Sequence, residues 1–388
     1  MPGHSRPQST GDFNRRSVIH SAAPRLDIAV IGCGAAAEGL YRYALGALES
    51  RGIARVAALV DPNPVRTAAL QRHFRAARTF ADPADAFASV AVDLVIVASP
   101  PGMHAQHTVD ALAAGSHVLC EKPMAIGAPD AERMVAAARV ARRILAVGMT
   151  RRMYPCLVEA QRLIAQGTLG DRLRFTYREG RVYDWPVNSD AAFRRATAGG
   201  GVLTDIGSHV LDFLSALFGA TTATSYADDA HADGVETNCR IEVVCPEASG
   251  VVQLSWNQPL VTRLRITGSA GELMLDPGRI DALRVRRGGG TWETRISTAT
   301  WPSDLATRGR GDTPRTHRDC VYHQLVQVLR AVTHGEDVPV DGERGLAVIR
   351  AIDSCYERAT SFELPWLDAA ERSQADARHW TRRRCAAA

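Results

Sequence analysis

The sequence has almost no lysine. Of the 46 residues that are lysine or arginine, only Lys122 is a lysine. Arginine and lysine serve almost equally well on a solvated surface, but only lysine offers a compact ammonium group that can lose its proton. Lys122 lies in a specific motif directly after a predicted strand, which favours a chemical role over chance survival.

Other absences exclude several classes of protein. None of the 8 cysteines forms a Cys-x-x-Cys pair, and most lie in apolar runs where cysteine acts as a small hydrophobe, so we expect reduced thiols. No apolar run approaches the length of a membrane span, and the segment after Arg16 is too short and polar for a secretory signal. We therefore expect a cytoplasmic protein with no membrane partner.

Length and composition predict a globular protein of two domains. The chain has 388 residues, of which 46% are hydrophobic and 23% charged, so it can bury a large core. The formal net charge of +4 is small for this size and the arginines are scattered, so we expect no nucleic-acid partner. Residues 1–24 are predicted to be a disordered arm, and residues 366–388 an irregular tail.

A strand, a glycine-rich turn and a helix follow the arm. Residues 26–31 form a short β-branched run that predicts a strand, and residues 38–48 predict a helix. Between them lies Gly32-x-Gly34-x-x-Ala37, the spacing of a dinucleotide-binding turn. The first glycine permits the tight turn, the second lets a pyrophosphate approach the backbone, and the small third residue allows close helix packing.

The next predicted strand, residues 54–60, ends in Asp61. A carboxylate at this position accepts hydrogen bonds from the adenosine ribose and repels a 2′-phosphate, which favours NAD over NADP. Arg66 weakens that preference, because a cation nearby would accept the phosphate. An ordinary βαβ unit without a nucleotide is the alternative, but the strands, glycines, helix and terminal acid together favour dinucleotide binding.

Helices and strands continue to alternate to about residue 150. We expect helices at 64–74, 105–114 and 131–142, and strands at 78–80, 93–98, 117–120 and 144–148. This rhythm predicts a doubly wound parallel sheet of six strands, a Rossmann domain of residues 25–150. Ser99-Pro100-Pro101-x-x-His104 and Glu121-Lys122-Pro123 each follow a strand at the carboxyl edge, where such sheets bind ligands. His104 either touches the cofactor there or lies on the side of a helix with His107.

Together these motifs resemble the glucose-fructose oxidoreductase/inositol dehydrogenase/rhizopine catabolism (Gfo/Idh/MocA) family. The resemblance covers all but the two tails and also includes Val147-Gly148-Met149-x-x-Arg152. It implies that the Lys122–Pro123 peptide is cis and that NAD is the cofactor. It also implies these cofactor-binding residues: Gly32, Cys33, Gly34, Ala35, Ala36, Asp61, Ser99, Pro100, His104, Glu121, Lys122 and Arg152.

The second half of the chain changes to strands without intervening helices. After a linking helix at 155–166, we expect strands at 172–182, 222–226, 237–245, 251–256, 263–267, 273–275, 282–286 and 291–296. Such a series predicts a largely antiparallel sheet with one open face, in an α+β domain of residues 151–365. The family resemblance implies a homodimer or homotetramer formed through the open face. It also implies that two late helices, at 317–332 and 344–359 with a strand at 338–340 between them, pack back towards the Rossmann domain.

A helix predicted at residues 203–218 carries the second part of the candidate site. Asp205 and His209 lie one turn apart on one face of this helix, which alone would suit a solvated pair. The family pattern Gly-Gly-x-x-x-Asp-x-x-x-His implies instead that both join Lys122 at the substrate. The spacing of Asp205, His209 and Asp212 would also suit a metal, but we predict none, because hydride transfer to NAD needs no metal.

These residues predict hydride transfer between nicotinamide and a secondary alcohol or ketone. His209 would act as general base in oxidation and general acid in reduction, because the usual pKa of histidine lies near neutrality. Lys122 would donate a hydrogen bond to the developing alkoxide. Asp205 would bind a second substrate hydroxyl or orient His209.

The substrate implied by the resemblance is a polyhydroxylated ring: a sugar, an aminosugar or a cyclitol. Tyr183 and Trp185 follow the first long strand and would either stack on such a ring or pack at an interface. Arg151 and Arg152 would bind a phosphate, a carboxylate or the cofactor itself.

Two other functions remain open. The first is a glycoside-cleaving relative that retains NAD and would turn over glycosides without a net change in NADH. The second is a nucleotide sensor without catalysis, which would have no need of Lys122 and His209.

Overall fold

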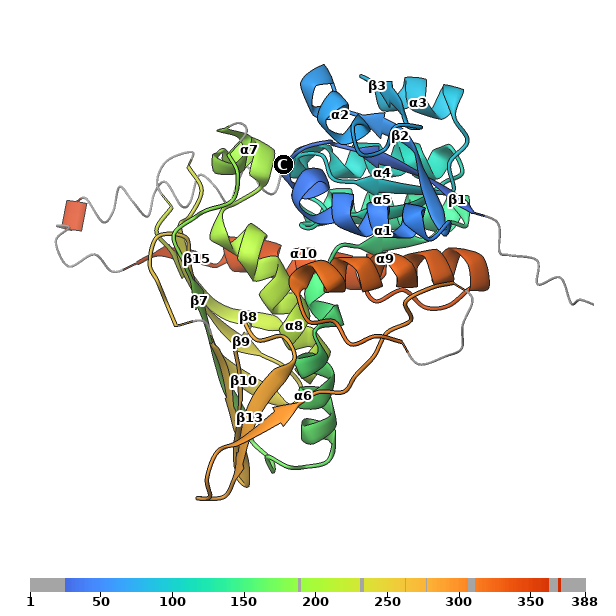
Figure 1. The fold of residues 1–388 in the computed structure, drawn as a ribbon. Helices are drawn as coiled ribbons and strands as arrows, with labels where there is room; N and C mark the ends of the chain where they lie inside the picture. The colour runs from blue at the N-terminus through green and yellow to red at the C-terminus, as the bar shows by residue number, and fades with distance from the viewer. Residues whose placement is uncertain are drawn as a thin grey trace, which may run out of the picture.

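The structure, a computed structural model, describes residues 25–187, 190–230, 234–261, 263–276, 278–305, 311–362 and 369–370. The predicted arm, residues 1–24, and most of the predicted tail, residues 366–388, lie outside these ranges. Two β-sheets organise the described part of the chain, with helices packed on and between them (Figure 1).

The first sheet is parallel and 6-stranded, in the order β3-β2-β1-β4-β5-β6. Its strands are β1 (Leu26–Ile31), β2 (Ala54–Val60), β3 (Arg78–Phe80), β4 (Leu94–Val97), β5 (His117–Cys120) and β6 (Leu145–Val147). All residues of β4 have 0% exposure, as expected for a parallel strand covered on both faces. The predicted doubly wound sheet is confirmed, and its order reverses between β1 and β4, where ligands bind such sheets.

Most flanking helices differ from the predictions only at their ends, but the helix at residues 83–89 was not predicted. They are η1 (Ala37–Tyr41), α1 (Arg42–Ser50), α2 (Pro64–Gln71), α3 (Pro83–Ser89), α4 (Pro101–Ala113) and α5 (Ala128–Ala141). The start of the helix predicted at 38–48 is the π-helical turn η1. Helix α4 begins at Pro101 instead of residue 105, because proline is well suited to the first turn of a helix, and His104 therefore lies in that turn.

The second sheet has nine strands in the order β14-β13-β12-β11-β7-β10-β9-β8-β15. Its strands are β7 (Leu173–Gly180), β8 (Thr222–Asp228), β9 (Asn238–Val244), β10 (Ala248–Ser255), β11 (Arg263–Thr267), β12 (Gly271–Leu275), β13 (Ala282–Arg287), β14 (Glu293–Ile296) and β15 (Ala359–Ser361). The pairs β7–β10 and β8–β15 are parallel and the others antiparallel, so the prediction of a largely antiparallel sheet is confirmed. The sequence did not predict β15, whose first residue was expected to end a helix.

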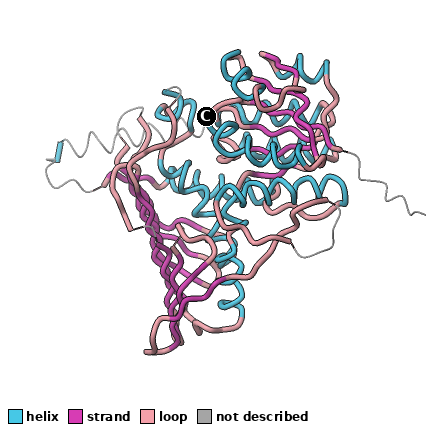
Figure 2. The backbone as a smooth tube through the Cα atoms, viewed as in Figure 1, coloured by secondary structure: helices cyan, strands magenta, loops and turns pink. Residues whose placement is uncertain are grey.

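Helices cover one face of this second sheet (Figure 2). They include α6 (Pro155–Ala165) and α8 (Ser208–Phe218), and Phe175 of β7 stacks on Phe218 of α8 with ring centroids 5.5 Å apart. The opposite face carries arginine–glutamate pairs, including Glu272 of β12 between Arg265 and Arg286. Exposed apolar residues Val244 and Ile296 lie at strand ends.

The last two long helices lie between the sheets. Helix α9 (His317–His334) packs on α1, and α10 (Gly342–Glu357) packs on α5 and α8 (Figure 1). The strand predicted at 338–340 is wrong. The backbone there makes only the bond from Val147 N–H to the Val340 carbonyl oxygen, 2.9 Å, and an isolated bridge from Ala146 to Asp341. Asp341 instead caps α10 by accepting a hydrogen bond from the Arg344 N–H, so the chain has already turned into the helix.

One helical stretch of the described chain, Arg195–Phe218, is long and apolar enough by composition to cross a membrane. However, 78% of its most apolar window is buried inside the molecule, as in the core helix of a globular protein.

Candidate active site

Lys122 and Asp205 meet between the two sheets. Lys122 follows β5 at the carboxyl edge of the first sheet, and its peptide bond to Pro123 is cis. Asp205 lies in the π-helical turn η4 (Leu203–Gly207), directly before α8. The Lys122 ammonium forms an ion pair with Asp205 Oδ1 and lies 3.4 Å from the Asp205 carbonyl oxygen.

Trp256 completes the surroundings of Asp205. Its indole Nε1–H donates to Asp205 Oδ2 over 3.2 Å. Burial disfavours the Asp205 carboxylate, but the charge and hydrogen bond of Lys122, together with the Trp256 donor, hold the pKa of Asp205 below its usual range. Asp205 is therefore ionised at neutral pH and holds Lys122 in place.

His209 lies one turn beyond Asp205, in the first turn of α8. Its Nδ1 atom is buried and has no hydrogen-bond partner among the described residues, although the side chain as a whole is partly exposed. Burial, followed by the charges of Lys122 and Arg151, lowers the pKa of His209 well below 6.5. The ring is therefore neutral at pH 7 and able to accept a proton.

Sequence reasoning missed a second histidine close to the site. His317 is the first residue of α9, and its Nδ1 lies 3.2 Å from the hydroxyl oxygen of Tyr154. Burial, then the charges of Arg151 and Lys122, lower the pKa of His317 to about 4. The capping box of Thr316 and Asp319 is visible in the sequence and marks the start of this helix, but no local signal places it beside Lys122.

The structure places Arg151 and Arg152 in internal ion pairs. Arg151 binds both carboxylate oxygens of Glu179, at 2.7 and 2.8 Å. Arg152 binds both carboxylate oxygens of Asp212 at 2.8 Å, and also the Ser215 hydroxyl at 3.1 Å. Each guanidinium therefore has its charge compensated by a carboxylate, and Asp212 is already paired.

The glycine turn after β1 forms a cradle suited to a dinucleotide. Gly32 has φ of +90°, and a Cβ there would lie 2.4 Å from the Ser99 backbone nitrogen, so only glycine fits. A Cβ on Gly34 would meet nothing within 4 Å, which leaves space for a phosphate beside the backbone. Ala35 and Ala36 follow at the start of the helix, where unpaired N–H groups favour an anion.

Asp61 connects this cradle to the end of β2. Its Oδ2 accepts from the Cys33 backbone N–H at 3.0 Å, and its Oδ1 accepts from the Asn63 N–H at 2.9 Å. Each carboxylate oxygen has a second lone pair to offer a ribose hydroxyl. The Arg66 guanidinium lies 3.9 Å from Asp61 Oδ2. Burial raises the pKa of the Cys33 thiol to about 12, so the thiol stays protonated at neutral pH.

His104 is buried between two backbone segments at the carboxyl edge of the first sheet. The side chain is 1% exposed, with Nδ1 2.8 Å from the Pro123 carbonyl oxygen and Nε2 2.7 Å from the Ser99 carbonyl oxygen. Two carbonyl acceptors favour the charged ring, but burial has the larger effect and lowers the pKa of His104 to about 4. The ring thus joins the segment containing Ser99 and Pro100 to the one that follows Lys122.

Glu121 links the lysine motif to the nucleotide helix. Its Oε1 accepts from the Tyr41 hydroxyl at 2.6 Å and its Oε2 accepts from the Lys122 N–H at 3.0 Å. Tyr41 belongs to η1, which follows the glycine turn. Burial raises the pKa of Glu121, although Tyr41 and Lys122 oppose that shift. The carboxylate thereby couples the position of Lys122 to that of the cradle.

The predicted aromatic residues separate into two environments. The Tyr183 ring packs against Trp256, with centroids 4.9 Å apart, and Phe193, with centroids 5.2 Å apart. Trp185 is 39% exposed, and its Cη2 lies 4.0 Å from the position that a Cβ on Gly39 would occupy. Trp185 therefore reaches from the second sheet to the nucleotide helix, whereas Tyr183 braces the tryptophan that holds Asp205.

A buried glutamate fixes the start of the helix that carries Asp205 and His209. Glu236 Oε1 accepts from the Gly201 N–H at 2.9 Å, the Leu203 N–H at 3.1 Å and the Tyr356 hydroxyl at 2.8 Å. Burial, then the nearby Asp228, raises the pKa of Glu236 to about 7. No sequence signal pointed to this residue, because it lies in a loop far from the helix it holds.

Replacing Gly201 with alanine is expected to destabilise the protein by about 1–3 kcal/mol. The added Cβ would lie 2.0 Å from the Glu236 carbonyl oxygen, which is backbone and cannot rotate away. Thermal or urea unfolding measures the change. The matched control is Gly46→Ala in α1, where a Cβ meets nothing within 4 Å and should stabilise by about 0.5–1 kcal/mol. Equal stability of the two variants would contradict the described fit.

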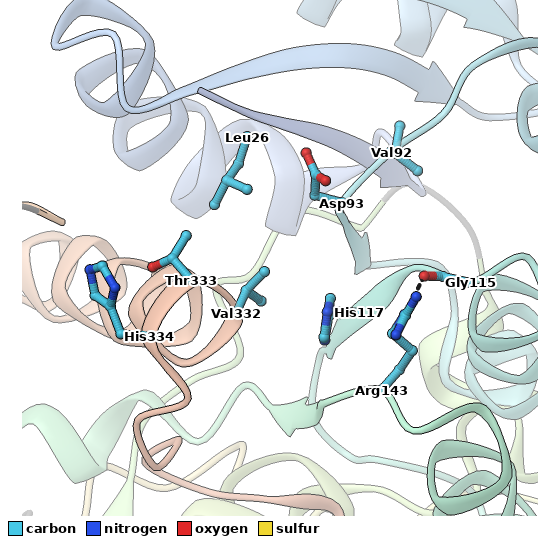
Figure 3. Close-up of a pocket in the computed structure, with 9 residues that line it drawn as sticks. All are labelled: Leu26, Val92, Asp93, Gly115, His117, Arg143, Val332, Thr333 and His334. Atoms are coloured by element: carbon cyan, nitrogen blue, oxygen red, sulfur yellow. Dashed lines mark hydrogen bonds between the residues drawn. The ribbon is translucent and has the colours of Figure 1, made fainter. Parts of the chain in front are cut away.

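A surface pocket of about 520 Å³ lies at the other edge of the first sheet (Figure 3). It is lined by residues at the amino ends of the strands, including Leu26 and His117, and by His334 at the end of α9. His117 accepts from the Ile144 N–H at 3.0 Å and His334 contacts the Leu305 carbonyl oxygen at 2.8 Å, so both rings are already engaged. Lys122 is not among the residues that line this pocket, and it follows β5 at the opposite, carboxyl edge of the sheet.

Comparison with known proteins identifies matching families and relatives. A family model described as "Oxidoreductase family, NAD-binding Rossmann fold" matches residues 26–149, and a GFO/IDH/MocA C-terminal domain model matches residues 157–274. A scyllo-inositol 2-dehydrogenase (NADP(+)) of Bacillus subtilis is 28% identical over 317 residues, covering 75% of this chain and 84% of the relative. D-glucoside 3-dehydrogenase of Escherichia coli is 32% identical over 190 residues, covering 48% of this chain and 52% of the relative.

Solved structures show the same fold. Levoglucosan dehydrogenase in complex with NADH and levoglucosan superposes with a TM-score of 0.72 at 21% identity, covering 86% of this chain and 97% of the other. An aldose-aldose oxidoreductase from Caulobacter crescentus, complexed with glycerol, gives a TM-score of 0.72 at 24% identity, with coverage of 86% and 97%. These likenesses establish the arrangement of the two sheets.

Proposed function

Because the chain belongs to the Gfo/Idh/MocA oxidoreductase family, we propose that it transfers a hydride between NAD(H) and a secondary alcohol or ketone of a sugar, aminosugar or cyclitol. One observation carries this proposal. The ammonium of Lys122, from the end of the first sheet, meets Asp205 one turn before a neutral His209 from a different part of the chain. A proton acceptor and a cation side by side suit the oxygen of an alcohol undergoing oxidation.

The side chains divide the work at that oxygen. NAD, when bound, supplies the acceptor or donor for the hydride. His209 takes the hydroxyl proton in oxidation and returns it in reduction. Lys122 donates a hydrogen bond to the oxygen as negative charge develops, and the charge of Asp205 keeps the ammonium in place.

Incubation of the protein with cyclitols, sugars and aminosugars tests the proposal. We expect NADH to form with at least one neutral polyol, measured by its absorbance. Glycoside cleavage without net NADH would favour the NAD-retaining alternative. Tight binding of NAD without turnover of any compound in the panel would favour the sensor alternative.

We expect NAD to bind more tightly than NADP, and Asp61→Ser to reduce the difference by at least about tenfold, roughly 1.4 kcal/mol. Asp61 is buried directly after β2, the position at which an acidic residue of a dinucleotide-binding βαβ unit binds the ribose and repels a 2′-phosphate. Serine removes the charge while keeping a hydroxyl. Titration of both nucleotides against wild type and variant measures the change. Tighter NADP binding by wild type would show that the attraction of Arg66 for the 2′-phosphate exceeds the repulsion from Asp61. The comparison is needed because one relative is named as an NADP(+) enzyme.

We further propose a homodimer or homotetramer formed through the outer face of the second sheet, and a cytoplasmic location with no nucleic-acid or membrane partner. The exposed Val244 and Ile296, together with alternating arginine–glutamate pairs, support a self-complementary face. We also propose a domain boundary near residue 150, with the late helices returning to the nucleotide-binding half. Light scattering of the purified protein determines the oligomeric state.

A further inference from the structure

The cationic side chains brought to the site are compensated by carboxylates of the same chain. The pairs are Lys122 with Asp205, Arg151 with Glu179, and Arg152 with Asp212. Of these, Lys122 has the role proposed above, and Arg152 is tied to α8 through a carboxylate that is 1% exposed. Arg151 is the remaining cation, and the charge of its partner Glu179 would affect the affinity for a charged substrate.

The pair of Arg151 and Glu179 is held rigidly. Two N–H groups of the guanidinium donate to the two carboxylate oxygens over 2.7 and 2.8 Å, the fork geometry that gives the strongest arginine–carboxylate contacts. The Tyr177 hydroxyl donates to Glu179 Oε2 at 2.7 Å and accepts from Arg151 at 2.8 Å. The two charged side chains are only 13% and 15% exposed, so solvent competes little with the pair.

The same pair lies within electrostatic reach of the reacting groups. Arg151 directly follows Thr150 at the carboxyl edge of the first sheet, and Glu179 lies at the end of β7. The positive charge of Arg151 contributes to the lowered pKa of both Asp205 and His209. Glu179 is also paired with Leu254 of β10, two residues before Trp256, which donates to Asp205. The Arg151–Glu179 pair therefore lies on the same part of the second sheet as the residue that holds Asp205.

We propose that Glu179 makes the site selective for uncharged polyhydroxylated rings, because it neutralises Arg151, which would otherwise bind a substrate carboxylate or phosphate. This inference rests on the proposed function. An anionic substituent at Arg151 would meet a carboxylate already bound to the guanidinium, so attraction to one charge is offset by repulsion from the other. Hydroxyl groups are not penalised in this way, because a guanidinium has five N–H donors and the contacts above use three of them.

The test uses matched neutral and anionic ligands with the NADH-loaded protein. The probes are glucose with glucuronate, and myo-inositol with myo-inositol 1-phosphate. Binding to the NADH-loaded protein, in which no alcohol can be oxidised, is followed by calorimetry. In a separate assay with NAD+ as the hydride acceptor, kcat/KM is measured for each ligand that turns over. We expect wild type to bind the neutral member of each pair at least tenfold more tightly. Glu179→Gln keeps the size and one acceptor oxygen for Arg151, and should shift the ratio towards the anionic member by at least tenfold.

Glu272→Gln is the matched control. Glu272 is also a glutamate of the second sheet paired with arginines, Arg265 and Arg286. It lies opposite Thr267 of β11, which pairs with Arg174 at the other end of β7 from Glu179. This substitution removes the same charge far from Arg151, so the neutral-to-anionic ratio should not change.

The outcomes separate this inference from the reaction itself. An anionic ligand bound as tightly as its neutral partner, binding of neither member by wild type, or an unchanged ratio in folded Glu179→Gln would overturn the inference. The ratio of neutral to anionic ligand binding by wild type tests charge selection even if the Glu179→Gln variant fails to fold. Preferential binding of neutral rings without NADH formation would support charge selection and contradict the proposed reaction. Preferred oxidation of glucuronate would support the proposed reaction and contradict charge selection.

Discussion

Replacing Lys122 with methionine is expected to reduce kcat by at least about 10³-fold while NAD binding changes little. Methionine keeps the length and apolar stem of the side chain but removes the hydrogen-bond donor at the reacting oxygen, a loss that typically costs 10²–10³-fold in rate. The variant also leaves the Asp205 carboxylate with Trp256 as its remaining described side-chain donor. A negative charge without its cation would further oppose the developing alkoxide.

Steady-state kinetics and NAD titration distinguish loss of chemistry from loss of binding. Arg139→Met is the matched control, since Arg139 is an exposed cation of α5 paired with Glu343 on the surface. Its activity should equal that of wild type. Lys122→Arg should recover little, because a guanidinium is larger and its charge is spread over a planar group. Full activity of Lys122→Met would remove the ammonium from the mechanism.

His209→Asn is expected to lower kcat for oxidation by about 10²- to 10⁴-fold, the usual contribution of a positioned proton acceptor. Asparagine keeps a polar group of similar reach but has no basic nitrogen. The pH dependence gives a sharper readout. The pKa of His209 is lowered well below 6.5, so the neutral ring needed for oxidation is fully present above pH 6.5 and is lost as the pH falls through the lowered pKa.

We therefore expect kcat/KM for oxidation by wild type to be flat near neutrality and to fall on acidification, whereas the residual rate of His209→Asn lacks this limb. Reduction requires the protonated ring and should show the opposite trend. His334→Asn is the matched control, because His334 lies at the far end of α9, at the pocket on the opposite edge of the sheet (Figure 3). An acidic limb that persists unchanged in His209→Asn would assign proton transfer to another group.

His317 is the alternative group that such a result would indicate. It lies beside Tyr154, and the same two cations, Arg151 and Lys122, lower its pKa. The pKa of both histidines is lowered below 6.5, so the position of an acidic limb does not by itself assign the limb to either of them. Loss of the limb in His209→Asn or in His317→Asn separates the two residues.

The elements that local patterns determine are those that the sequence predicted well. The six strands of the first sheet, the glycine turn and Asp61 follow from apolar runs and from residues that the backbone geometry requires. The spacing of Asp205 and His209 follows from helix periodicity, although the helix begins with a π-helical turn. The errors are shifted element ends, the unpredicted elements α3 and β15, and the segment 338–340, where one hydrogen bond and one bridge replace a strand.

The residues missed by sequence reasoning share one property. Trp256, His317, Glu179 and Glu236 act through partners that are distant in the chain, and none of them lies in a periodic pattern with those partners. Arg151 illustrates the limit most clearly. Its position after β6 suggested anion binding, but the carboxylate that compensates it is supplied 28 residues later, at the end of β7.

Local sequence patterns were sufficient to predict a βαβ unit of the dinucleotide-binding type, one lysine at its carboxyl edge, and an aspartate–histidine pair on a later helix. Each of these depends on spacing within one element, which the backbone converts directly into geometry. The contact of Lys122 with Asp205, 83 residues away, and the pairing of Glu179 with Arg151 became visible in the folded chain alone. Such pairings depend on how two sheets pack together, and packing between distant segments has no local signature.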